Sequence, residues 1–167
     1  EWSEGPIWSN KLNSVLFSDV PENVIYMWNE ENGLSVFTKP IGYSGEVPNL
    51  KKAGTNGLTI DSDGNLIICM HGDRKIASME DLNIDKMTTL VSNFEDNLFN
   101  SPNDLVYDSK GNLFFTDPPY GLKMKDDDTL KELNFNGIYK WSKSKGIELL
   151  SKSMKRPNGI ILSKDEK

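Results

Sequence analysis

The 167 residues are enough for one ordinary domain, and 37% hydrophobic with 26% charged residues is the composition of a protein with a packed core. A net charge of -6 makes nucleic acid and anionic membrane surfaces poor partners, because both carry negative charge. No apolar run approaches the roughly 18 residues of a membrane span. The single cysteine, Cys69, excludes an internal disulfide and a thiolate metal cluster. Composition leaves the oligomeric state open.

Taken in chain order, the predicted strands form repeated units. The first unit starts at Ser3 with SEGPIWSNKLNSVLFSD and continues with VIYMW and LSVFTK; the second starts at Thr55 with TNGLTIDSDGNLIICMH and continues with KIASME and TTLVSN. The third starts at Pro102 with PNDLVYDSKGNLFFTDP, and GIYKW and GIELLS follow a polar stretch, 123–134, that we expect to be a loop or a single helical turn. PNGIILSKDEK, from Pro157, opens a fourth unit.

Each complete unit predicts four β-strands. The runs are short and rich in Leu, Ile and Val, and a Gly in the connection of the second and third units supplies the positive φ that hairpin turns need. Four antiparallel strands repeated about every 50 residues are typical of β-propeller blades. We therefore expect an all-β fragment of about three and a half blades. Residues 1–167 would form part of one propeller domain, truncated at the C-terminus and, since no initiator Met is present, at the N-terminus.

The same position of each unit carries an oxygen-bearing side chain. If the first strand of every unit runs along the channel, then Glu4, Asn56, Asn103 and Asn158 lie around one mouth of it and the turns face away. Antiparallel pairing also brings His71 close to Asn56, and residues 117–120 close to Asn103. A ring of one carboxylate and several amide oxygens is a hard donor set, suited to calcium and similar cations.

These motifs resemble, in order, those of the gluconolactonase branch of the SMP-30/gluconolactonase/LRE-like family, to which regucalcin is related. The matching segments are SEGPIW, TNGLTIDSDGNLIIC, HGDRKI, FNSPNDLVYDSKGNLFFTDPPYGL, NFNGIYKW and RPNGIILSKDEK. The resemblance implies a six-bladed propeller with one divalent cation at the channel mouth and hydrolysis of a sugar lactone. Calcium is the first expectation, with zinc, manganese and magnesium as alternatives. Relatives with these motifs are often bacterial and exported, although a cytoplasmic location stays open.

Residue by residue, the resemblance implies metal ligands at Glu4 and Asn158, with Asn103 at or beside the metal. A further Asp ligand, proposed in the family to transfer the proton, belongs to the next blade and has no counterpart in this sequence. For binding of the substrate we predict Asn56, Asn103, Asp104 and Tyr120, and His71 is a candidate acid–base group.

Each candidate also has a structural alternative. Glu4 and the Asn residues could satisfy the amides of turns. Asp104 could tie blade backbones together, His71 could be a structural histidine at a strand end, and Tyr120 could pack in the core. The alternative for the whole protein is a non-catalytic propeller that binds a carbohydrate, peptide or protein, because propellers serve many functions.

Overall fold

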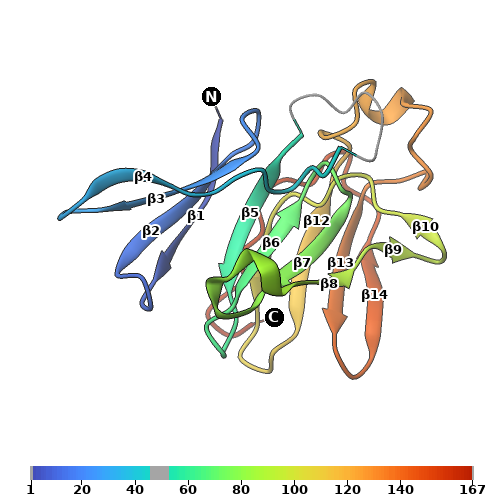
Figure 1. The fold of residues 1–167 in the computed structure, drawn as a ribbon. Helices are drawn as coiled ribbons and strands as arrows, with labels where there is room; N and C mark the ends of the chain where they lie inside the picture. Colours follow the sequence, from blue (N-terminus) through green and yellow to red (C-terminus); the bar gives the residue numbers. More distant parts are fainter. Residues whose placement is uncertain (1, 46–52, 167) are drawn as a thin grey trace.

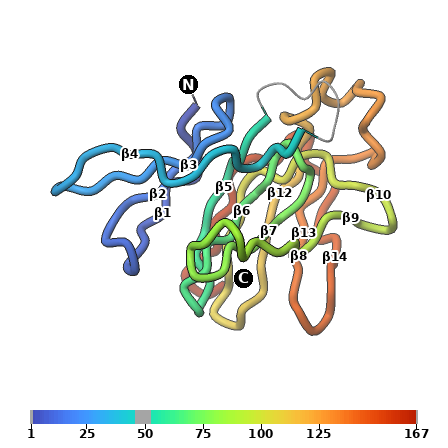
Figure 2. Tube along the Cα trace, viewed as in Figure 1, coloured from blue at the N-terminus to red at the C-terminus, as the bar shows by residue number. Residues whose placement is uncertain are grey.

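The computed structural model describes residues 2–45 and 53–166, and antiparallel β-sheets dominate them (Figures 1 and 2). Three sheets have four strands each, and in each sheet neighbouring strands follow the order of the sequence. This confirms the predicted all-β propeller architecture with four strands per unit. The sheets are blade 1, with β1 (Ser3–Ser9), β2 (Ser14–Asp19), β3 (Val24–Asn29) and β4 (Gly33–Thr38); blade 2, with β5 (Thr55–Ile60), β6 (Leu66–Met70), β7 (Lys75–Met79) and β8 (Met87–Val91); and blade 3, with β11 (Leu105–Tyr107), β12 (Leu113–Asp117), β13 (Gly137–Ser142) and β14 (Gly146–Ser151).

The connections between strands hold a few short elements. Two 3₁₀ turns, η1 (Glu80–Leu82) and η2 (Ile84–Lys86), join β7 to β8, and η3 (Lys125–Asp127) lies in the stretch predicted as a loop or single helical turn. A two-stranded hairpin of β9 (Asn93–Phe94) and β10 (Asn97–Leu98) was not predicted. None of the helices in the described ranges is long and apolar enough to cross a membrane.

The hairpin turns between β5 and β6 and between β11 and β12 share one chemistry. In the first, Asp61 Oδ1 accepts the backbone N–H groups of Asp63 and Asn65, at 3.0 and 2.8 Å, and Asp61 Oδ2 accepts the Asn65 amide at 3.0 Å. Gly64 has a φ of +84°, which favours glycine. Residues 108–112 repeat every one of these bonds. The pattern Asp-Ser-x-Gly-Asn therefore specifies the turn. It fixes where β5 and β11 end; these strands and β1 are the first strands of their blades, called inner strands below.

The sheets pack face to face, and blade 2 contributes to the core on each of its two faces. All of β6 is buried, and its side chains alternate between two cores, because successive residues of a strand point to opposite faces. Leu66 and Ile68 join the core shared with blade 1, whereas Ile67 and Cys69 join the core shared with blade 3. The continuous apolar run in this strand is thus the signature of a sheet covered on both sides.

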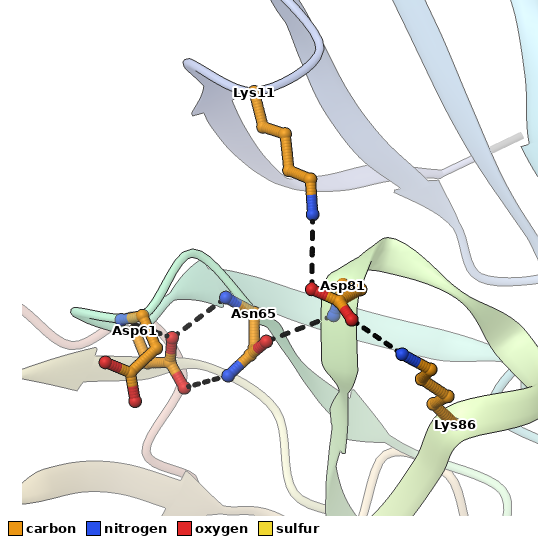
Figure 3. A network of polar contacts seen from close by, with 6 residues as sticks. Lys11, Asp61, Asn65, Asp81 and Lys86 are labelled. Carbon is orange, nitrogen blue, oxygen red and sulfur yellow. Dashed lines mark hydrogen bonds and ion pairs between the residues drawn. The ribbon is translucent and has the colours of Figure 1, made fainter.

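Polar contacts connect blades 1 and 2 at their turn ends (Figure 3). Lys11, from the β1–β2 turn, lies 3.5 Å from Asp81 Oδ1, and Lys86 Nζ lies 2.6 Å from Asp81 Oδ2. The Asp81 N–H donates to Asn65 Oδ1, which joins this group to the β5–β6 turn. All three ionic side chains are about half exposed or more, so water and salt screen the attraction within each pair. The close packing of the blades, not this ionic group, therefore holds the sheets together.

The inner strands approach one another backbone to backbone. An added Cβ at Gly57 of β5 would lie 2.6 Å from the Asn103 carbonyl oxygen and 2.8 Å from Asp104 Cα. At Gly5 of β1 it would lie 2.6 Å from the Leu58 nitrogen. Gly57 after Asn56 and Gly5 after Glu4 are therefore positions where a side chain has no room.

We expect Gly57→Ala to lower the free energy of unfolding by about 1–3 kcal/mol, because backbone atoms of the next blade would have to shift. The matched control is Gly159→Ala, at the same position of the fourth unit, where the nearest atom is Asp104 Oδ2 at an ordinary 3.7 Å. Urea unfolding followed by circular dichroism measures both. Equal losses of stability in the two variants would contradict the close approach at Gly57.

Candidate functional site

The inner strands of the three blades and the start of the fourth unit border one groove of about 490 Å³. All four oxygen-bearing residues at the equivalent repeat positions line it: Glu4, Asn56, Asn103 and Asn158. The other lining residues are Gly5, Pro6, Ile7, Leu58, Thr59, Asp104, Leu105, Val106, Gly159, Ile160 and Ile161. The groove thus has a polar group of side chains together with an apolar wall.

The backbone carbonyls of the three Asn residues are each fixed by the preceding blade. Ser18 Oγ of blade 1 donates to Asn56 O at 2.6 Å, and the Gly57 N–H of blade 2 donates to Asn103 O at 2.7 Å. Thr116 Oγ1 of blade 3 donates to Asn158 O at 2.6 Å. These bonds hold the main chain at each position and leave the side chain free for another task.

The side chains themselves have no partner in the described part of the chain. None of the hydrogen bonds formed there involves the side chain of Glu4, Asn56, Asn103 or Asn158, so none of these residues caps a turn within it. Asn56 and Asn103 are only 7% and 4% exposed. Their amide atoms are nevertheless not enclosed by protein, since the enclosed, unpartnered side-chain atoms of the described residues are Asn100 Oδ1 and Tyr139 Oη. The two amides therefore open into the groove.

These donors fit a hard cation. Glu4 is exposed and can contribute a carboxylate, and the Asn amides add neutral oxygens, the ligand types that calcium takes. No group of three or more His, Cys, Asp or Glu side chains able to hold a metal occurs in residues 2–45 and 53–166. Any metal in this groove would therefore depend on amide oxygens, and a thiolate or imidazole site of the zinc type is not formed by the described residues.

Asp104 lines the groove, but its carboxylate is already bonded. Oδ1 accepts the N–H of Leu105 at 2.9 Å, and Oδ2 accepts the N–H of Ile160 at 2.8 Å. The second bond ties β11 to the fourth unit. These contacts are those of the structural alternative, in which Asp104 joins the backbones of neighbouring blades, and its binding of substrate stays a prediction.

His71 is only 3% exposed and does not line the groove. Its Nδ1 lies 3.1 Å from the carbonyl oxygen of Pro102, which can only accept, so Nδ1–H is the donor. Burial lowers the pKa of His71 to about 4, only partly offset by this bond. The imidazole is therefore neutral at pH 7 and has the contacts of a structural histidine.

Tyr120 lies in the Pro-Pro-Tyr-Gly loop after β12, is 38% exposed, and is not part of the groove lining. The structure therefore places it neither in the core nor in the groove. Stacking of Tyr120 on a sugar stays a prediction.

Two buried ionisable side chains were not among the predicted site residues, although strand pairing had placed Asp117 close to Asn103. Asp117 at the end of β12 is fully buried, and burial raises its pKa to about 7, against the opposing effects of two backbone N–H groups and of Arg74 and Lys131. Arg74, in the HGDR segment after β6, is 3% exposed. Their residue types alone carry no signal, because charged residues after strands are common in exposed turns.

Fold and groove together define part of a β-propeller, with a candidate ligand groove along the first strands of its blades. The model of the SMP-30/gluconolactonase/LRE-like region matches residues 2–167, and the chain belongs to this family. A gluconolactonase of Zymomonas mobilis subsp. mobilis (strain ATCC 31821 / ZM4 / CP4) is 38% identical over 168 residues, which cover 99% of this chain and 47% of the relative.

Two solved structures are also similar over 99% of this chain. A gluconolactonase from Xanthomonas campestris has a TM-score of 0.81 at 27% identity, with 52% of its chain covered. A structure described as a putative gluconolactonase has a TM-score of 0.83 at 26% identity, with 53% covered. The chain spans about half the length of these relatives.

We expect the Cε1 proton of His71, the one histidine of the chain, to titrate near pH 4 in an NMR experiment. Because the folded pKa lies below the ordinary 6.5, the unfolded state binds more protons between these values, and His71 makes the unfolding free energy fall as pH is lowered from 6.5 to 4. The raised pKa of Asp117 makes the unfolding free energy rise as pH is lowered from 7 to 3.8. The effects of His71 and Asp117 on stability therefore overlap, and only a residue-specific titration separates them. A His71 midpoint near 6.5 would show that the imidazole is solvated.

Proposed function

We propose that the protein hydrolyses a sugar lactone in the groove, with a divalent cation, calcium first, held by Glu4, Asn103 and Asn158. The observation that carries the proposal is the convergence of oxygen-bearing side chains from successive units on one groove, with no hydrogen-bond partner in the described residues. Membership of the gluconolactonase family supports the same reaction.

The groove residues divide into two tasks. Glu4, Asn103 and Asn158 supply hard oxygens for the cation, which when bound would polarise a carbonyl oxygen and lower the pKa of a water molecule. Asn56 has both a donor and an acceptor, the combination that a sugar hydroxyl needs. Ile7 and the other apolar residues of the lining can cover the carbon face of a sugar ring.

The described groove offers no free carboxylate as a general base besides Glu4. Asp104 is the other acidic residue in the lining, and both of its oxygens accept backbone N–H groups. Each oxygen of Asp104 is thus already used to hold the backbone. We therefore propose no proton-transfer role for Asp104, and none for the buried His71.

Full-length protein should hydrolyse glucono-1,5-lactone, and a chelator should abolish the activity until calcium is restored. Asn103→Ala should lower the rate and the calcium affinity at least about tenfold, because it removes one of the three proposed ligand oxygens. Asn112→Ala is the matched control, since it changes the same residue type in the same hairpin at the turn end. A pH-stat or colorimetric assay follows the acid produced.

Three outcomes would decide against parts of the proposal. Turnover that a chelator does not affect would refute the metal dependence. Calcium binding without turnover of any sugar lactone would favour the non-catalytic propeller. An Asn103→Ala protein with undiminished affinity and rate would remove Asn103 from the site.

A further inference from the structure

A polar clamp, buried at Arg74 and Asp117, holds the segment that precedes Asn103. Residues 99–104 belong to no strand, yet residues 99–103 are buried, so their backbone donors and acceptors need partners other than water. Three side chains distant in sequence supply partners for residues 98–101: Arg74, Asp117 and Glu132.

The first half of the clamp grips residues 98 and 99. Arg74 Nε donates to the carbonyl oxygen of Phe99 at 2.5 Å, and Nη2 donates to that of Leu98 at 3.4 Å. Glu132 Oε2 accepts the Leu98 N–H at 2.7 Å, while Oε1 pairs with Arg74 Nη1 at 3.3 Å. A buried guanidinium thus has its charge balanced by the same carboxylate that holds the segment.

The second half grips residues 100 and 101. Asp117 Oδ2 accepts the N–H of Asn100 at 2.8 Å, and Oδ1 accepts that of Ser101 at 2.7 Å. Ser101 Oγ in turn donates to the Pro118 carbonyl at 2.5 Å. Because both carboxylate oxygens are occupied by adjacent amides, the segment is fixed in direction as well as position, one residue before Pro102 and two before Asn103.

We propose that Asp117 and Arg74 are positioning residues that fix the side chain of Asn103 in the groove. This inference rests on the proposed function only for its consequence on cation binding; the placement of Asn103 is a separate claim. Bonds from two adjacent backbone amides to the two oxygens of one side chain are directional. Outer residues that orient a metal ligand typically change affinity by about 10- to 100-fold when they are lost.

The test variant is Asp117→Asn, which keeps the shape but replaces one acceptor by an NH₂ group that faces a backbone N–H. We expect the side-chain NH₂ signal of Asn103 in ¹⁵N NMR spectra of the full-length protein to broaden or split, and the amides of residues 100 and 101 to exchange about tenfold faster or more. Calcium affinity should fall about 10- to 100-fold.

The matched control is Asp108→Asn in the turn of the same hairpin. Asp108 also accepts two backbone N–H groups, from Lys110 at 2.9 Å and Asn112 at 2.8 Å, but at the end away from Asn103. It should leave the Asn103 signal and the calcium affinity unchanged, even if it costs comparable stability. An Asn103 signal that is the same in both variants and wild type would overturn the proposal.

Two further measurements keep the claim testable. If Asp117→Asn does not fold, Arg74→Lys should show the same change at Asn103, because an ammonium cannot reproduce the guanidinium's contacts with Leu98, Phe99 and Glu132 together. In wild type, the amides of residues 98, 100 and 101 should exchange as slowly as strand amides, and fast exchange would refute the clamp. If wild type binds no calcium, the proposed function fails, whereas the NMR comparison still judges the placement of Asn103.

Discussion

The site depends on one constraint, the hydrogen bond that the carbonyl of each Asn at the repeat position accepts from the preceding blade. The carbonyls of Asn56, Asn103 and Asn158 each accept a bond from the preceding blade. The fold already provides a hydrogen-bond partner for the main-chain oxygen of each Asn. The amide side chain is therefore not needed for this contact and stays available for a ligand. Repeating this arrangement along the chain turns a structural repeat into a set of oxygen donors along one groove.

The units differ in how they achieve the contact, and the differences follow from the residue after the Asn. Gly57 allows β5 to touch the backbone of Asn103 and Asp104, just before β11. The Gly57 N–H donates directly to the carbonyl oxygen of Asn103. In the third unit Asp104 occupies the Gly position, and its carboxylate reaches across to the Ile160 N–H at 2.8 Å. A side-chain bond there takes the place of direct backbone contact, which explains why an acidic residue lines the groove without being free.

Much of the fold and of the groove could be predicted from the sequence, because both follow from local repeats. Short apolar runs around Asp-Ser-x-Gly-Asn predicted the strands, and their register predicted that Glu4 and three Asn residues would lie around one mouth of the channel. In the structure these residues line one groove. The β9–β10 hairpin gave no signal, since its turn places Glu95 and Asp96 at positive φ where Asn-Gly would be expected. Strand register also placed His71 near the mouth, but its burial depends on Pro102 and Gly121, which only the fold brings to it. The clamp of Arg74, Asp117 and Glu132 joins residues far apart in the chain, and no local pattern indicates it.

The most direct measurement of this account is a crystal structure of the full-length protein grown with calcium, with diffraction recorded at a long wavelength where calcium scatters anomalously. The account predicts one anomalous peak in the groove, about 2.3–2.6 Å from oxygens of Glu4, Asn103 and Asn158. A groove without such a peak, or these three side chains bonded to other protein groups, would contradict the claim that successive units offer free oxygens to a common ligand.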